Sequence, residues 1–288
     1  LTFGNKLNEQ PSKIDYAADR LSYRFDLPYW LTKVISSFLL QSYYPLLPAV
    51  FNIKYYTNLH LASFQSLVRI TDEWWVYSKG IRVILLKQIE SNKIIFQRHG
   101  ISPVFFKVER NAEGPHKFLF SGRLVKIKGF QTLLTAWSQL EENTLKELWI
   151  TGDSNLGDYI TKKFLKKIGH RKDIKFLGSL TQEELSNTYA QTHTLIIPSE
   201  CYEIGPLVFH EAIACGCNVI ASDVGGCKEL AEYYQGSTTS FEAGDVQDLK
   251  DKINQQLSLT NHATQNKPIA FNTHFEMITQ QSDVYIHD

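Results

Sequence analysis

Two basic and two acidic side chains have the types and spacing to bind a sugar linked to a diphosphate. Arg123 and Lys128 stand in one polar loop, and Glu203 and Glu211 stand eight residues apart further along the chain. A guanidinium presents a planar pair of donors to phosphate oxygens and an ammonium adds a point charge, so together they can neutralise a diphosphate without a metal. Each carboxylate oxygen accepts a hydroxyl, so Glu203 can bind sugar hydroxyls while Glu211 binds a ribose.

Backbone donors are expected between the two glutamates. A helix is predicted over residues 206–215, with Pro206 near its first position. Gly205 and the first residues of this helix would then present free N–H groups at the positive end of the helix dipole. The alternative is that the basic residues are solvated and the glutamates are simply acids favoured at a helix start.

These groups fall in loops that follow short apolar runs. From residue 118 onward such runs alternate with helical segments. The predicted strands are residues 118–121, 147–151, 174–177, 194–197, 218–221 and 237–241. The predicted helices are residues 130–140, 158–168, 181–190, 206–215 and 245–257. This alternation is typical of βαβ units in a doubly wound parallel sheet, where ligands bind beyond the carboxyl ends of the strands.

Four loops are expected at that edge of the sheet: residues 122–129, 152–158, 198–205 and 222–229. The last of these contains Gly225 and Gly226, which suit either close approach to a ligand or a tight turn into a helix. No G-x-G-x-x-G follows a predicted strand and no G-x-x-x-x-G-K-[ST] occurs. A dinucleotide Rossmann site and a P-loop are therefore both disfavoured.

An earlier strand–helix–strand is predicted at residues 74–76, 81–89 and 93–97. Residues 102–115 contain two prolines and one glycine and are predicted to be a linker between domains.

Composition narrows the classes of protein. Lys and Arg total 30 and Asp and Glu total 30, so the chain has no excess of positive charge with which to bind nucleic acid. Hydrophobic residues make up 43% and charged residues 21%, which is typical of a globular protein. The four cysteines all lie between Cys201 and Cys227 and are expected to be core thiols in a reducing cytoplasm.

Membrane contact is considered for the aromatic stretch 29–51. Charged, polar and proline residues interrupt it, so it lacks the ~20 consecutive apolar residues that cross a bilayer. A buried helix is the expected structure, and docking on the surface of a membrane is the alternative.

Three stretches are similar to a known family. FSGRLVKIKGFQTLL, LWITGD and PSECYEIGPLVFHEAIACGCNVIASDVGGCKEL resemble, in their order and spacing, the carboxy-terminal domain of the family-four retaining glycosyltransferases. Glu203 and Glu211 match the E-x7-E motif of that family. The resemblance implies an α/β fold of the GT-B type with two Rossmann-like domains, the first incomplete in this amino-terminally truncated chain and the second a doubly wound parallel sheet.

The resemblance also implies a role for each matching side chain. Arg123 and Lys128 are expected to bind the diphosphate of the donor. Glu203 is expected to contact the transferred sugar, and Glu211 to bind the ribose.

Further candidates come from the same resemblance. The backbone of Gly205, Pro206 and Leu207 is expected to supply amides to the sugar. Glu229 matches a glutamate that follows the glycine pair of the family, with a less direct role. The segment YYTNLH resembles one that holds an active-site histidine, so His60 joins the catalytic candidates, with an ordinary structural imidazole as the alternative.

Three parts of the chain are expected from this resemblance. Residues 1–105 would be a partial acceptor-side domain and residues 106–265 the nucleotide-sugar-binding domain. Residues 266–288 would form a helix that crosses back to the first domain.

The implied reaction is hexosyl transfer from a UDP- or GDP-sugar to an acceptor hydroxyl, with retention of configuration and with neither metal nor cofactor. The acceptor would be a glycan or a lipid-linked molecule, as in polysaccharide or surface-glycan biosynthesis. The expected place is the cytoplasm, with contact to the inner face of the membrane as an option. The alternatives are a non-catalytic or degenerate nucleotide-binding module, and another enzyme of the same architecture such as an epimerase or a phosphorylase.

Overall fold

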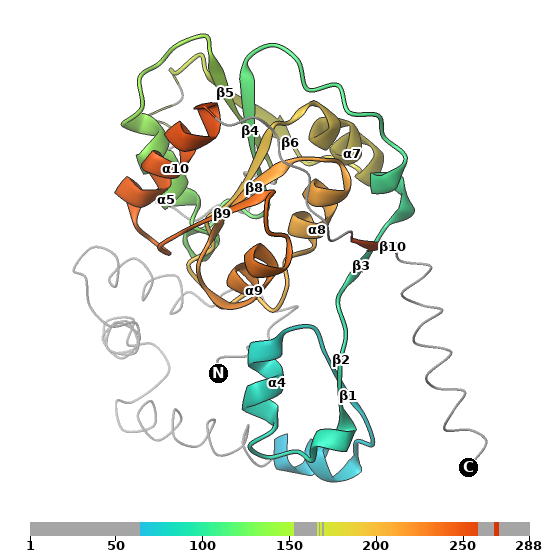
Figure 1. Cartoon of the computed structure of the whole chain (residues 1–288). Coiled ribbons are helices and arrows are strands. Elements are labelled where there is room, and N and C mark those ends of the chain that lie inside the picture. Colours follow the sequence, from blue (N-terminus) through green and yellow to red (C-terminus); the bar gives the residue numbers. More distant parts are fainter. Residues whose placement is uncertain (1–63, 153–165, 167, 169, 259–267, 271–288) are drawn as a thin grey trace, which may run out of the picture. The chain divides into compact units, whose positions relative to one another are not determined.

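The computed structural model describes residues 64–152, 166, 168, 170–258 and 268–270 (Figure 1). The chain divides into two compact units, Leu1–Asp72 and Glu73–Asp288. Of the first unit only residues 64–72 are described, and residues 64–70 of these are helical. His60, the stretch 29–51 and nearly all of the predicted helix 158–168 lie outside the described residues. The domain boundaries expected after residues 105 and 265 stay predictions.

Among the described residues of the second unit, six parallel strands form the main sheet, as the alternation of apolar runs predicted. Their bounds are β4 (His116–Ser121), β5 (Lys146–Thr151), β6 (Ile174–Gly178), β7 (Thr194–Ile197), β8 (Asn218–Ser222) and β9 (Thr238–Phe241). In space the order is β6-β5-β4-β7-β8-β9. Because the order runs outward from β4 in one direction and from β7 in the other, the topology switches between these two neighbours, where ligands bind in folds of this type.

Helices cover both faces of this sheet (Figure 1). Those in the described part of the chain are α5 (Phe130–Ser138), α7 (Gln182–Gln191), α8 (Leu207–Ala214), α9 (Gly225–Tyr233) and α10 (Val246–Ser258). One hydrophobic cluster joins α5 and α10 to one face, and a second joins α7, α8 and α9 to the other. The chain therefore forms the doubly wound α/β domain that its sequence predicted.

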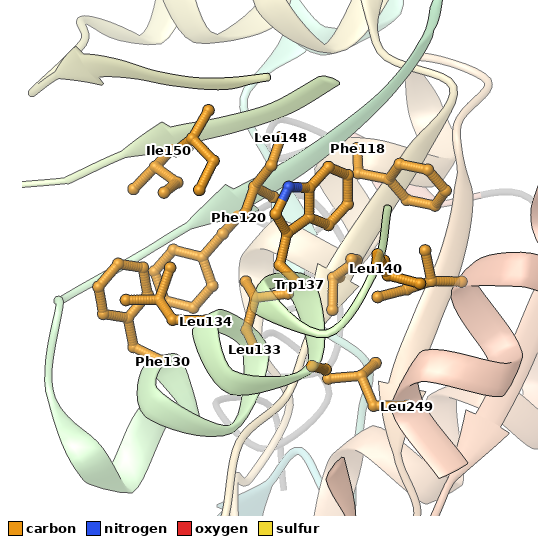
Figure 2. Packing of buried hydrophobic residues seen from close by; sticks show 14 of the residues in the cluster. Phe118, Phe120, Phe130, Leu133, Leu134, Trp137, Leu140, Leu148, Ile150 and Leu249 are labelled. Carbon is orange, nitrogen blue, oxygen red and sulfur yellow. The ribbon is translucent and has the colours of Figure 1, made fainter. Parts of the chain in front are cut away.

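Successive residues of β4 show why this stretch is apolar throughout. Phe118 and Phe120 belong to the cluster on the α5 face, whereas Leu119 belongs to the cluster on the opposite face. Side chains alternate along a strand, so a strand that is covered on both faces needs an apolar residue at every position. Figure 2 shows Phe118 beside Trp137 of α5, in an edge-on contact with the ring centroids 5.6 Å apart.

The starts of three helices can be traced to single residues. Thr181 and Glu184 form the predicted capping box at the start of α7. Pro206 keeps an extended backbone as the N-cap of α8, so that helix begins at Leu207, one residue later than predicted. The loop predicted over residues 222–229 is short, because α9 already begins at Gly225.

The predicted linker over residues 102–115 is partly core. It starts with the 3-10 helix η2 (Pro103–Phe106). Phe105 is 1% exposed and packs into the cluster under α7 and α8, edge-on to Tyr189. The Cys215 thiol also donates to the carbonyl of Phe105 across 3.3 Å. Pro103 thus starts a turn that packs against the sheet domain, and this part of the stretch is not a free connection.

A smaller strand–helix–strand precedes the main sheet. It consists of β1 (Trp74–Val76), α4 (Lys79–Leu85) and β2 (Ile94–Phe96), with the two strands parallel. Helix α4 begins two residues before the predicted position because the Ser78 hydroxyl caps it, accepting from the N–H of Ile81 at 3.2 Å. Two further short strands, β3 (Gly100–Ile101) and β10 (Ile269–Ala270), pair with each other. Within the described part of the chain, none of the helices is both long and apolar enough to span a bilayer.

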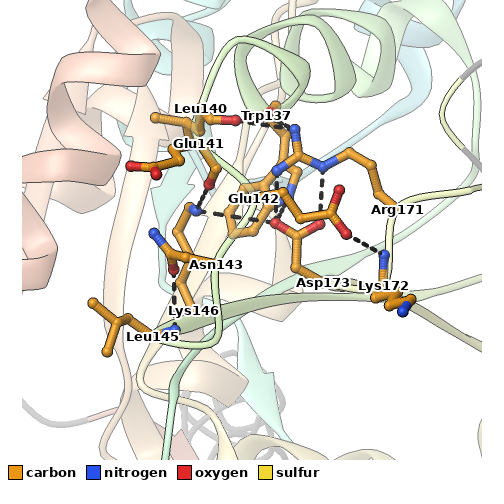
Figure 3. A network of polar contacts seen from close by, with 10 residues as sticks. All are labelled: Trp137, Leu140, Glu141, Glu142, Asn143, Leu145, Lys146, Arg171, Lys172 and Asp173. Atoms are coloured by element: carbon orange, nitrogen blue, oxygen red, sulfur yellow. Dashed lines mark hydrogen bonds and ion pairs between the residues drawn. The ribbon is translucent and has the colours of Figure 1, made fainter.

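A buried ionic cluster lies at the amino-terminal ends of β5 and β6 (Figure 3). The Arg171 guanidinium donates to both carboxylate oxygens of Asp173, at 2.8 and 2.7 Å. It also donates to the carbonyls of Trp137 and Leu140, each at 3.0 Å. The Lys146 ammonium lies 4.0 Å from the same carboxylate. The cluster thereby fastens the carboxyl end of α5 to the sheet, at the edge opposite the predicted ligand site.

Candidate active site

Three of the predicted loops meet at the carboxyl ends of β4, β7 and β8. The N–H of Glu200 donates to the carbonyl of Ile127 at 3.0 Å. The Ser222 hydroxyl donates to the carbonyl of Ser199 at 2.7 Å, and the N–H of Gly226 donates to the carbonyl of Glu203 at 2.6 Å. Loop 198–205 is therefore bonded to its neighbour on each side. Only Gly152 of the fourth predicted loop, 152–158, is described.

Close backbone contact between two of these loops depends on Gly129. This residue follows the 3-10 helix η3 (Lys126–Lys128) and has a left-handed backbone with φ 65°. A β-carbon at this position would lie 1.5 Å from the carbonyl oxygen of Pro198. Only glycine therefore lets the β4 loop and the β7 loop come together.

Lys128 and Glu203 form an ion pair at this junction. The Lys128 ammonium lies 2.5 Å from Oε1 of Glu203. The Ser199 hydroxyl donates to the same oxygen, also at 2.5 Å. The side chains are 26% and 14% exposed, so the pair is partly shielded from water. The residues predicted to bind the diphosphate and the sugar thus lie in direct contact with each other.

Arg123 lies exposed in the same loop as Lys128. Within the described part of the chain, the Arg123 guanidinium forms no hydrogen bond and no ion pair with another residue. The charge of Arg123 acts on the nearby Cys201 thiol. The pKa of this thiol is raised chiefly by burial and then by the charge of Glu203, whereas Lys128 and Arg123 act to lower it. Three of the four predicted side chains, Arg123, Lys128 and Glu203, therefore act electrostatically on one thiol.

Glu211 lies on α8 and has a different environment. Burial raises the pKa of its carboxyl group to about 7. The hydroxyl of Tyr189 donates to its Oε2 at 3.3 Å, and Tyr189 also hydrogen-bonds with Ser121, the last residue of β4. Glu211 is thus tied to the switch point of the sheet. Among the described residues no hydrogen bond joins it to Lys128 or Glu203.

The amino end of α8 leaves backbone donors available. The N-cap of this helix makes no side-chain hydrogen bond. Pro206 has no N–H of its own, so of the three predicted amide donors only Gly205 and Leu207 can serve. Leu207 is 47% exposed. The positive end of the α8 dipole therefore opens beside the Glu203 loop, in a form suited to a negatively charged group.

Residues 102–272, more than half of the chain, match the sequence profile of the family described as "Glycosyl transferases group 1". The chain belongs to this family. The match covers every described loop of the candidate site and confirms the family resemblance drawn from the motifs.

A curated relative and two solved structures extend this finding. An uncharacterised glycosyltransferase of Methanocaldococcus jannaschii is 33% identical over 115 residues, which are 40% of this chain and 29% of that protein. Anabaena HepE in complex with UDP and glucose has a TM-score of 0.66 at 19% identity, covering 88% of this chain and 75% of that one. Sucrose-phosphate synthase of Thermosynechococcus elongatus has a TM-score of 0.68 at 18% identity, covering 100% and 83%.

These structural likenesses confirm the GT-B type of α/β fold for this group 1 glycosyltransferase family member. The chain spans less than a third of the length of the M. jannaschii relative.

Three residues of the candidate site in this family member were not predicted from the sequence. Ser199 binds Glu203, Tyr189 binds Glu211, and Tyr202 precedes Glu203 directly. Ser199 had a visible signal, because it is a polar residue next to the end of an apolar run. Tyr189 had none, since it sits in an ordinary helical pattern.

Glu229 does not contact the Lys128–Glu203 ion pair and instead binds the start of α4. Its carboxylate accepts from the hydroxyl of Ser78 and from the N–H groups of Lys79 and Gly80 at the start of α4. Over the described ranges, no group of three or more His, Cys, Asp or Glu side chains is placed to hold a metal ion.

Proposed function

We propose that this chain binds a nucleotide-diphosphate sugar and transfers its sugar to an acceptor hydroxyl. The observation that supports the proposal most is the ion pair of Lys128 with Glu203 in the loops at the switch point of the sheet, beside the exposed Arg123. Cations for a diphosphate and a carboxylate for sugar hydroxyls are thus present side by side. Family membership and the UDP and glucose bound to the HepE neighbour support the same substrate class.

The expected chemistry follows from where charge grows. The bond between the anomeric carbon and the diphosphate oxygen breaks, and the acceptor oxygen forms the new bond to that carbon. Negative charge accumulates on the leaving diphosphate, where Arg123, Lys128 and the free amides of α8 can stabilise it. One preorganised donor of this kind typically contributes about 3 kcal/mol, roughly a hundredfold in rate.

The finer features of the proposal rest on the family resemblance. They are retention of configuration, attack from the side of the leaving group, and passage of the acceptor proton to the departing phosphate. Independence of metal is proposed because Arg123 and Lys128 supply two positive charges. The same proposal includes a UDP- or GDP-sugar as donor and a glycan or lipid-linked acceptor. It also includes polysaccharide or surface-glycan synthesis in the cytoplasm, with contact to the inner face of the membrane as an option.

The test combines calorimetry with a turnover assay. UDP, GDP and ADP are titrated into the wild type in the presence of EDTA, and release of nucleoside diphosphate from UDP-glucose and GDP-mannose is measured. The Arg123→Ala variant is expected to lose roughly tenfold or more in turnover, because it lacks one donor to the leaving group. Arg82→Ala, which removes an exposed arginine of α4, is the matched control and should keep wild-type turnover.

Two outcomes would contradict the proposal. Wild-type turnover in Arg123→Ala would remove Arg123 from the reaction. Binding of a nucleotide without any release from its sugar derivative would favour the non-catalytic nucleotide-binding module.

A further inference from the structure

The loop that carries Glu203 contacts the start of α9. The N–H of Gly226 donates to the carbonyl of Glu203 at 2.6 Å. The ring of Tyr202 lies over Gly225, where a β-carbon would be 3.0 Å from the ring carbon Cγ. This side of the loop is therefore held by contacts to backbone.

On its other side, the Tyr202 hydroxyl reaches the start of α4. It lies 3.1 Å from the hydroxyl oxygen of Ser78. A β-carbon on Gly80 would be 1.9 Å from the same Tyr202 oxygen. The two residues adjoin so closely that only glycine at position 80 leaves room for the tyrosine.

Glu229 of α9 completes the arrangement. Its Oε1 accepts from the Ser78 hydroxyl at 2.7 Å and from the N–H of Gly80 at 2.8 Å, and its Oε2 accepts from the N–H of Lys79 at 2.7 Å. A carboxylate at the positive end of a helix forms strong, charge-assisted hydrogen bonds.

The direction of the hydrogen bond between Tyr202 and Ser78 follows from these contacts. The single hydroxyl proton of Ser78 goes to the Glu229 carboxylate, which can only accept. Ser78 must therefore accept from Tyr202, so the hydroxyl group of the tyrosine is the donor that links the Glu203 loop to α4.

We propose that Tyr202, Ser78 and Glu229 form a clamp that positions Glu203 for the sugar of the donor. Tyr202 is 46% exposed, so its ring contributes little to the core, yet its hydroxyl is fixed by a fully buried serine. Because Tyr202 directly precedes Glu203 in the chain, a shift of the tyrosine also shifts the backbone that carries the Glu203 carboxylate. The expected effect of the clamp on turnover rests on the proposed function. The expected effect of the clamp on the position of the loop does not depend on that function.

The first experiment removes only the hydroxyl. Tyr202→Phe is expected to lower release of nucleoside diphosphate from UDP-glucose or GDP-mannose by roughly fivefold, because one hydrogen bond that holds the loop is lost. Affinity for the free nucleoside diphosphate should stay within about twofold, because Tyr202→Phe keeps both members of the Lys128–Glu203 pair that the diphosphate meets. A purely structural tyrosine would change both quantities or neither. Tyr233→Phe on α9 is the matched control.

The second experiment uses the close contact at Gly80. Gly80→Ala should lower turnover by a similar roughly fivefold in the wild-type background, because the new methyl group displaces the Tyr202 hydroxyl. In the Tyr202→Phe background the same change should cost less, since the nearest remaining atoms, of the ring and of the Glu229 carboxylate, are each 3.2 Å from the new carbon. Equal costs in the two backgrounds would overturn the clamp.

The third readout needs no turnover. Cys201 is half-buried in the Glu203 loop, whereas Cys215, Cys217 and Cys227 are buried, so native alkylation with iodoacetamide reports on this loop. We expect alkylation of Cys201 to become about threefold faster in Tyr202→Phe, because the freed loop opens more often. An unchanged rate would overturn the clamp even if the wild type transfers no sugar, whereas a faster rate without any turnover in the wild type would overturn only the proposed function.

Discussion

Lys128 and Glu203 neutralise each other at the place where both are expected to meet a donor. The ammonium and the carboxylate are 2.5 Å apart, so neither can bind a ligand fully while the pair persists. A donor that carries both a diphosphate and a sugar can replace both partners at once. Free nucleoside diphosphate can replace only one, which leaves Glu203 without its cation.

This exchange predicts an unusual effect of Glu203→Gln. The substitution frees Lys128 for the diphosphate, so affinity for free UDP or GDP should rise by roughly fivefold, the equivalent of about 1 kcal/mol for a partly exposed pair. Turnover of the nucleotide sugar should fall, because the sugar loses its carboxylate. Calorimetry and the release assay measure the two effects.

Glu200→Gln is the control for this change. It removes a carboxylate of the same loop that accepts from Thr132 at 2.5 Å and not from Lys128. If Glu203→Gln binds the free nucleotide no more tightly than Glu200→Gln does, the two partners do not compete in the way proposed.

A dependence of nucleotide binding on pH is predicted from Glu211. Because burial raises its pKa to about 7, its carboxyl group is largely protonated below that pH and ionised above it. Only the ionised form accepts from two ribose hydroxyls. Nucleotide affinity should therefore rise between about pH 6 and about pH 8 in the wild type, relative to Glu211→Gln. The titration of the phosphate is common to both proteins and cancels in the comparison.

The same residue affects stability with a defined sign. An acid whose pKa is raised by folding keeps its proton in the native state after the unfolded chain has released it. The free energy of unfolding of the wild type should fall, relative to Glu211→Gln, as the pH rises from about 4.5 to about 7. Urea unfolding at both ends of this range checks the sign, and a rise would mean that Glu211 is ionised in the native protein.

At the scale of elements, the ionic cluster of Figure 3 and the candidate site lie at opposite ends of the strands. Lys146 is the first residue of β5 and Asp173 directly precedes β6. Burial lowers the pKa of Lys146, while the charge of Asp173 raises it. The carboxylate is therefore what keeps two buried cations paired.

Asp173→Asn should cost about 3 kcal/mol or more in the free energy of unfolding, because Arg171 is left as an uncompensated buried charge. Glu147→Gln is the control, since it breaks the more exposed pair with Lys175, at 2.8 Å, and should cost less than about 1 kcal/mol. Urea unfolding measures both. Equal losses would show that the cluster is no stronger than a surface ion pair, and nucleotide affinity should be unchanged in both variants.

At the scale of the whole molecule, the strands of the main sheet were predicted closely. The strand Thr194–Ile197 has its predicted bounds, because a strand covered on both faces is an apolar run between polar residues. Helix ends were predicted less well. Helix α9 was not among the predicted helices, and its first residues were placed in a loop, since Gly225 and Gly226 suit a turn as well as a helix start.

The site was predicted as residue types, and its contacts were not. Arg123, Lys128 and Glu203 were found from local patterns, but Lys128 and Glu203 are 75 residues apart and Ser78 and Glu229 are 151 residues apart. Periodicity describes which face a residue lies on and says nothing of which distant residue meets it. The ion pair and the clamp arise only when the loops are brought together, and His60 stays a prediction outside the described residues.

The glycines at the contacts between the loops determine which segments must be exchanged together in a chimera of two relatives. Loop 198–205 touches Gly129 before it and Gly226 after it, and a β-carbon on Gly226 would lie 2.6 Å from the carbonyl oxygen of Ile204. A loop transplanted alone would therefore contact neighbouring loops whose backbones fit the original loop. Loops 122–129, 198–205 and 222–229 contact one another and should be exchanged as one unit. If the proposed function holds, we expect a graft to change the sugar preference only when all three are moved together.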